Sequence, residues 1–157
     1  MPTLQRPFDQ WRVQQFDPHY GYAWYCGEGL IVSHVTVTHC TVASARAYHA
    51  FEGAVLRDRA AEIARAGGLF VIHDWRTMGS YEREGRQFWQ ARMRERPKGY
   101  LKGSLVCVAK ANKLLRMAVE GANLIASLTH GGKVELTTDI DEALRRYHVG
   151  PERSFDR

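Results

Sequence analysis

Residues 69–81 read Leu-Phe-Val-Ile-His-Asp-Trp-Arg-Thr-Met-Gly-Ser-Tyr, and this stretch decides the predicted fold. It opens with an apolar run at 69–73 that shows no alternation of polar and apolar residues. Such a run after a helix is typical of a central parallel strand buried on both faces. A polar loop follows from Asp74, and a helix is predicted to begin at Ser80. Because open α/β sheets usually bind ligands where their strands end, we expect a site in this loop.

The segments on either side repeat this order of strand and helix. Gly27-Glu28-Gly29 marks a turn, and Gly67-Gly68 marks a helix end. Thr41 or Ser44 is expected to cap the first helix, and Asn112 a later one. The predicted elements are a strand pair at 19–26 and 30–39, helices at 41–66, 80–96, 112–128 and 138–147, and strands at 102–110 and 133–137. They predict an α/β fold with a mixed, largely parallel sheet of about five strands, opened by a β-hairpin and accompanied by four helices.

Composition fits one globular domain. The chain has 157 residues, of which 45% are hydrophobic and 25% charged. We expect an N-terminal arm at 1–18, the domain at 19–148 and a C-terminal tail at 149–157. No apolar run approaches the roughly 18 residues that span a bilayer, and the N-terminus lacks the apolar segment of a secretory signal. These features predict a cytoplasmic protein, and the formal net charge of +5 weakly favours acidic partners.

No arrangement of residues predicts catalysis. His73 and Asp74 are adjacent, but neighbouring side chains of a strand point to opposite faces, so we do not expect them to converge. The histidines and cysteines lack metal-ligand spacing, and nucleotide-binding and nucleophile motifs are missing from the sequence. We therefore expect neither an enzyme nor a bound metal or cofactor. The basic segment from Arg83 to Lys102 has its aromatic residues at core spacing, which favours a solvated basic face above a buried stripe. An acidic protein or an anionic membrane surface is the next alternative, ahead of nucleic acid.

Three features resemble the STAS family, whose type example is the bacterial sporulation anti-sigma-factor antagonist. They are the element order over residues 20–147, the strand Leu69–Asp74 that leads into Met78-Gly79-Ser80, and the segment Asp139-Ile-Asp-Glu-Ala-Leu144. In particular, the chain looks like the divergent SpoIIAA-like branch, also described as STAS/SEC14-domain proteins. The resemblance implies a bacterial regulatory protein and no family-wide reaction.

The resemblance also implies a candidate phosphoacceptor. In typical STAS members the loop after the third strand reads Asp-Ser-Ser-Gly, and one serine is phosphorylated. The corresponding stretch here is Thr77-Met-Gly-Ser80, so Ser80 is the nearest candidate and Thr77 the second, although the string itself is absent. The alternative role for Ser80 is that of a helix N-cap.

The loop and the resemblance together predict a non-enzymatic regulatory or scaffold module that binds an unidentified protein. The expected interaction surface is the loop after the third strand and the helix start that follows it. Its residues are Asp74, Trp75, Arg76, Met78, Gly79, Tyr81 and Arg83.

The helix predicted at 112–128 favours an alternative function. Its apolar residues surround most of its circumference, whereas a helix on a small open sheet has one face to cover. We expect its spare side to meet the N-terminal arm, a second subunit of a homodimer or an apolar ligand. The alternative is therefore a carrier of a lipid-like ligand, or a membrane-surface-associated STAS/SEC14-like protein. The ligand or dimer face would comprise Leu115, Val119, Ala122 and Ile125.

Overall fold

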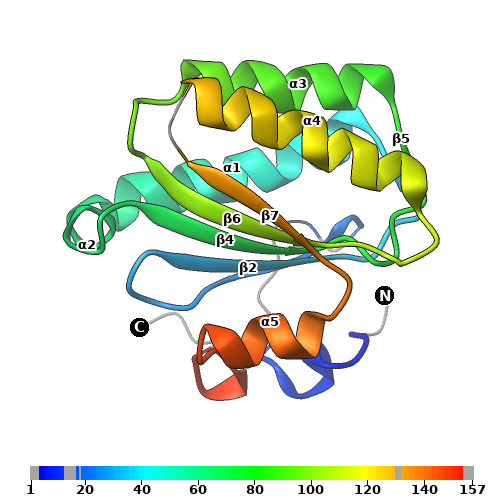
Figure 1. The fold of residues 1–157 in the computed structure, drawn as a ribbon. Coiled ribbons are helices and arrows are strands. Elements are labelled where there is room, and N and C mark those ends of the chain that lie inside the picture. The colour runs from blue at the N-terminus through cyan, green and yellow to red at the C-terminus, as the bar shows by residue number, and fades with distance from the viewer. Residues whose placement is uncertain (1–3, 13–16, 18, 130–131, 154–157) are drawn as a thin grey trace.

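The computed structural model of the chain describes residues 4–12, 17, 19–129 and 132–153, with the backbone alone at 122–129. Its centre is a five-stranded sheet in the order β1-β2-β4-β6-β7 (Figure 1). β1 and β2 form an antiparallel hairpin, and the other neighbours pair in parallel. The predicted α/β fold with a mixed, largely parallel sheet is therefore confirmed. The strands are β1 (Gly21–Tyr25), β2 (Leu30–Val35), β4 (Leu69–Asp74), β6 (Leu101–Cys107) and β7 (Lys133–Thr137).

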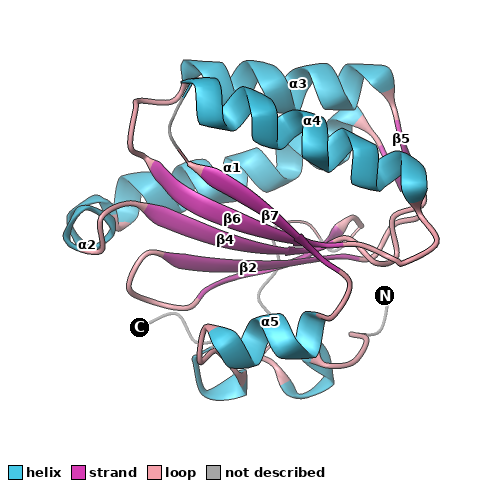
Figure 2. Cartoon of the chain, viewed as in Figure 1, coloured by secondary structure: helices cyan, strands magenta, loops and turns pink. Residues whose placement is uncertain are grey.

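Helices cover both faces of the sheet. α1, α3 and α4 lie on one face, whereas α5 and the N-terminal segment lie on the other (Figures 1 and 2). Within the described part of the chain four helices have seven residues or more, as predicted: α1 (Val42–Asp58), α3 (Arg83–Glu95), α4 (Lys113–Thr129) and α5 (Ile140–Arg146). The shorter helical segments are α2 (Ala60–Arg65), η1 (Phe8–Gln10) and η2 (Pro151–Arg153).

The helix predicted at 41–66 is divided in two. Thr41 caps α1 as expected, because its hydroxyl accepts from the Ser44 backbone N–H at 3.2 Å while the Ser44 hydroxyl accepts from the Thr41 N–H at 2.9 Å. At Arg59 the backbone leaves the helical region, with φ −118° and ψ 20°. Beyond this break α2 buries Ile63.

Two predicted boundaries near the central strand are wrong. The strand predicted at 30–39 ends at Val35, and the helix predicted from Ser80 begins at Arg83. The reason is a second, two-stranded parallel sheet, in which β3 (His39–Cys40) pairs with β5 (Ser80–Tyr81). The backbone N–H of Ser80 donates to the Thr38 carbonyl at 3.2 Å, so Ser80 takes part in strand pairing rather than helix capping.

The two ends of the described chain pack into the α5 side of the core. Phe8 is fully buried, with its ring stacked on Trp24 at a centroid distance of 5.3 Å. Val149 is buried as well, and the Arg153 side chain donates to the Cys26 carbonyl at 3.0 Å. The described parts of the arm and the tail thus belong to the same packed unit as the sheet.

Candidate functional site

A cavity of about 160 Å³ lies between the sheet and the helices α1, α3 and α4. Apolar side chains form most of its walls. Val71 and Val106 reach it from the sheet because alternate residues of β4 and β6 point to this face. Met78 reaches it from the loop after β4, and Leu115 and Val119 from α4. The cavity is therefore part of the main core layer between sheet and helices.

Polar side chains occupy one part of this lining, and we call them the polar wall: Tyr48, His49, Glu52 and His73. The first three share one side of α1, because residues three and four apart in a helix lie on the same face. His73 comes from β4, the central strand. All are buried, with exposed fractions between 4% and 6%. A group of buried polar side chains beside an apolar cavity is typical of a small-molecule site.

Hydrogen bonds and an ion pair fix part of the polar wall. The Tyr48 hydroxyl donates to Glu52 Oε2 at 3.0 Å, and His73 Nδ1 lies 2.7 Å from the Ser33 hydroxyl. Arg96 Nη2 lies 3.6 Å from Glu52 Oε1. The Glu52 carboxylate is thus held from two sides, which compensates for part of the free energy of burying it.

Other polar atoms of the wall are buried and have no hydrogen-bond partner among the described residues. They are both ring nitrogens of His49 and Oε1 of Glu52. Burial, together with the charge of Arg96, lowers the pKa of His49 to about 3, and burial lowers the pKa of His73 to about 3. Burial raises the pKa of Glu52 against the opposing charge of Arg96. Both histidines are therefore neutral at pH 7, with one N–H donor and one acceptor nitrogen each.

Trp89 of α3 packs against the polar wall. Its ring centroid lies 4.3 Å from His49, 5.1 Å from Tyr48 and 5.5 Å from His73. Trp75, from the loop after β4, lies 5.6 Å from Trp89 and also lines the cavity. Aromatic rings thus border the polar groups, and such rings pack well against flat apolar ligands.

Four residues of this site were not predicted from the sequence: Tyr48, His49, Glu52 and Trp89. The sequence feature that could have indicated them is Glu52, a carboxylate on the buried stripe of the helix predicted at 41–66, four residues after Tyr48. Charged residues are almost never fully buried unless they are paired. A carboxylate at such a position therefore indicates either a buried ion pair or a binding site. In the structure Glu52 pairs with Arg96 and also lines the cavity.

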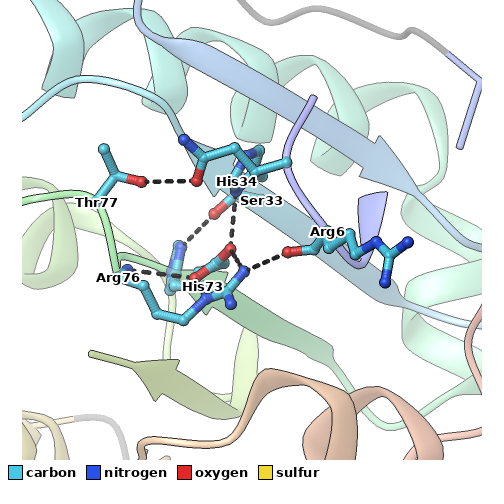
Figure 3. Close-up of polar contacts among 8 residues, drawn as sticks. Arg6, Ser33, His34, His73, Arg76 and Thr77 are labelled. Atoms are coloured by element: carbon cyan, nitrogen blue, oxygen red, sulfur yellow. Dashed lines mark hydrogen bonds and ion pairs between the residues drawn. The ribbon is translucent and has the colours of Figure 1, made fainter. Parts of the chain in front are cut away.

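Asp74 lies on the opposite face of the sheet from His73, as predicted, within a separate buried network. Figure 3 shows His34 and Arg76, which belong to this network, near Ser33 and His73. Its Oδ2 is 2.8 Å from His34 Nδ1, and Arg76 Nε donates to its Oδ1 at 2.8 Å. Burial acts to raise the pKa of Asp74, but the bonds from Arg76 and His34 outweigh it and lower the pKa below its usual value. Arg76 Nη2 also donates to the Arg6 carbonyl at 2.8 Å, which connects the N-terminal arm to the end of β4.

Some residues of the predicted interaction surface are buried in the core, and others are exposed to solvent. Several of its residues turn inward to line the cavity rather than outward to a partner. Asp74 and Met78 are buried, Trp75, Arg76 and Tyr81 are half-buried, and Gly79 and Arg83 are exposed. Trp75, Met78 and Tyr81 line the cavity.

Both predicted phosphoacceptors have hydrogen-bond partners. Ser80 Oγ lies 2.7 Å from His39 Nδ1, and the Thr77 hydroxyl donates to Gln5 Oε1 at 3.4 Å. Ser80 does not cap α3, because Glu82 is the residue that precedes the first helical turn. Phosphorylation of Ser80 or Thr77 stays a prediction.

The predicted ligand or dimer face on α4 is described in part. Leu115 and Val119 are buried in the cavity wall, with exposed fractions of 2% and 4%. The side chains of Ala122 and Ile125 lie outside the described residues. Leu114 and Met117 point outward and are 58% and 68% exposed, which accounts for the wide apolar circumference of this helix.

In the described segments, no helix combines the length and the apolar character needed to cross a bilayer. No protein-family model, curated protein or solved structure matches this chain. Membership of the STAS family therefore stays a prediction, and the function is inferred from the geometry of the cavity.

Proposed function

We propose that this protein binds a small, largely apolar molecule in the cavity beneath α1, α3 and α4, as a carrier or sensor that catalyses no reaction. The observation that carries the proposal is a cavity of about 160 Å³ with aliphatic and aromatic walls between the sheet and three helices. Protein interiors are normally close-packed, and voids larger than a water molecule are few. An engineered apolar cavity of about 150 Å³ binds benzene, so a molecule with one ring fits here.

The free energy of unfolding should depend on whether this cavity is filled. Apolar walls that contact no filling group lose dispersion contacts, so an empty apolar cavity lowers the free energy of unfolding. A ligand that contacts the walls recovers part of this free energy. Because the unfolded chain has no cavity, such a ligand binds the native state selectively and raises its stability.

Thermal unfolding with toluene tests the proposal. Saturating toluene is expected to raise the Tm by a few degrees, because it binds the native state alone. Ala118→Phe fills the cavity from α4 and should abolish the rise. Met117→Phe places the same side chain at the neighbouring position, which is 68% exposed, and should keep the rise. An unchanged Tm, together with unchanged NMR signals of the cavity-lining methyl groups, would contradict the proposal.

A protein-binding surface is the second candidate function, and exposed residues beside the end of β4 favour it. The Asn112 amide donates to the carbonyls of Met78 and Gly79 at 3.1 and 3.3 Å, so the start of α4 lies beside the loop. Leu114 and Met117 are exposed in the first turns of α4, and Arg83 is exposed at the start of α3. Exposed apolar side chains near a basic residue suit an acidic partner with an apolar contact.

Affinity capture with matched variants tests this second candidate. A protein that wild type retains and that Arg83→Glu and Met117→Glu each lose would support the surface. Arg57→Glu makes the same charge change at an exposed position on α1, outside the proposed surface, and should retain the partner. Equal retention by all variants would argue against this surface.

A further inference from the structure

The polar wall contains an unsatisfied donor and acceptor side by side. His49 Nδ1 and Glu52 Oε1 are 4.0 Å apart, which is too far for a hydrogen bond between them. Both atoms are buried and have no hydrogen-bond partner in the described part of the chain. A buried polar atom without a partner destabilises the protein, because it loses its hydrogen bonds to water and gains none in return. Two such atoms in the wall of a cavity therefore point to a polar group of a ligand.

The spacing of these atoms suits one bridging oxygen. An oxygen about 2.8 Å from each atom makes two hydrogen bonds of normal length. A hydroxyl group has one donor and two acceptor lone pairs, so it can donate to a carboxylate while it accepts from a ring N–H. The neutral ring of His49 supplies that N–H. Glu52 Oε1 contacts Arg96 only at 3.6 Å, beyond hydrogen-bond distance, so its lone pairs can accept a hydrogen bond from the ligand hydroxyl.

We infer that the ligand is an uncharged molecule with an apolar ring and a hydroxyl group, a simple phenol in chemical class, whose hydroxyl bridges Glu52 and His49. This inference rests on the proposed function and adds the polar group that the ligand must carry. Trp75 and Trp89 line the cavity beside the polar wall, which favours a ring over a chain.

The same geometry selects against anions. A ligand carboxylate would bring a second negative charge beside Glu52, which is 4% exposed. Arg96 lies 3.6 Å from Glu52 Oε1 but does not line the cavity, so its charge is directed to Glu52 rather than to the ligand. Arg86 does line the cavity, but it is exposed, so water and salt screen its charge. Like charges in a buried site repel strongly because water does not screen them.

Titration of the full chain with four probes of similar size, toluene, phenol, benzoate and benzylamine, tests the inference by NMR or calorimetry. Wild type is expected to bind phenol about tenfold more tightly than toluene, and benzoate more weakly than toluene. His49→Phe and Glu52→Gln should each reduce the preference for phenol to about threefold or less while toluene still binds. Gln90→Leu changes another polar residue of the lining and should keep the preference.

The outcomes separate this inference from the proposed function. Equal affinity for toluene and phenol, or tightest binding of benzoate or benzylamine, would overturn the hydroxyl assignment and leave the cavity as a ligand site. Failure of all four probes to bind would overturn the proposed function. If a variant does not fold, the comparison of probes on wild type still decides the inference.

Discussion

His73 and Asp74 are adjacent in sequence, yet each bonds to a different residue of β2 on a different face of the sheet. The parallel register of β2 and β4 places Ser33 beside His73 and His34 beside Asp74. On the cavity face Ser33 and His73 are 2.7 Å apart, and on the α5 face His34 and Asp74 are 2.8 Å apart. Both polar networks therefore depend on this register, because a slip of one residue would move each side chain of the strand to the opposite face of the sheet.

Removal of the Asp74 carboxylate should strongly destabilise the fold. Asp74 is 1% exposed and accepts hydrogen bonds from Arg76, so Asp74→Ala leaves Arg76 and His34 without their partner. We expect the free energy of unfolding to fall by about 3 kcal/mol, as for other buried pairs that lose one member. Urea unfolding measures this change.

Asp58→Ala is the matched control for Asp74→Ala. The Asp58 side chain is 62% exposed and pairs with Arg57 at the surface. Its removal should change the free energy of unfolding by less than about 0.5 kcal/mol. Equal effects of the two substitutions would show that the buried network does not stabilise the fold.

The buried histidines should make the protein less stable in mild acid. An unfolded histidine has a pKa near 6.5, whereas burial lowers the pKa of His49 and of His73 to about 3. Between these values the unfolded state binds more protons than the folded state, so the free energy of unfolding falls as the pH falls. The raised pKa of Glu52 acts in the opposite direction, because Glu52 takes up its proton more readily when folded.

Urea unfolding at pH 7 and pH 5.5 measures this dependence. The two histidines together should reduce the free energy of unfolding by about 2 kcal/mol between these conditions. His73→Gln removes one titrating group and should roughly halve the loss, whereas His19→Gln at an exposed position should leave it unchanged. A pH dependence that is the same in His73→Gln and wild type would contradict the assignment.

The N-terminal arm should be essential to the stability of the domain. Phe8 is fully buried and lies between Trp24 and His34, at centroid distances of 5.3 and 4.8 Å. Phe8→Ala should lower the free energy of unfolding by about 3–5 kcal/mol, the range for large aromatic residues in cores. Met117→Ala removes an exposed apolar side chain and should change it by less than about 0.5 kcal/mol. A small effect of Phe8→Ala in denaturant unfolding would show that the arm is dispensable.

The sheet could be predicted because its signals are local. The apolar run of β4, the hairpin turn before β2 and the Thr41 cap each need a few neighbouring residues to be recognised. β3 and β5 could not be predicted, since two residues are too few for a period-two pattern. The polar wall could not be predicted either, because Glu52, His73 and Trp89 come from three separate elements and meet through tertiary packing alone.

The turn before β2 should set the register on which both polar networks depend. Gly29 has φ +74°, and a Cβ built there would lie 2.8 Å from the Gly68 carbonyl oxygen. The Gly29 carbonyl accepts from the Phe70 N–H at 2.8 Å, so this close approach fixes where β2 and β4 begin to pair. Gly67 has a similar φ of +80°, but a Cβ there meets nothing within 4 Å. A side chain would therefore meet similar backbone strain at both positions, but only at Gly29 would it also contact the Gly68 carbonyl.

Comparing Gly67→Ala with Gly29→Ala separates the effect of backbone strain from the effect of the close contact with Gly68. Gly67→Ala should lower the free energy of unfolding by about 1–2 kcal/mol, the strain of a side chain in the left-handed region. Gly29→Ala adds a contact with backbone that cannot move aside without shifting β4, so its loss should exceed that of Gly67→Ala by at least about 1 kcal/mol. The NMR signals of His34 and His73 should also shift in Gly29→Ala and stay unchanged in Gly67→Ala. Equal losses and unchanged histidine signals in both variants would show that the turn at Gly29 does not determine the strand register.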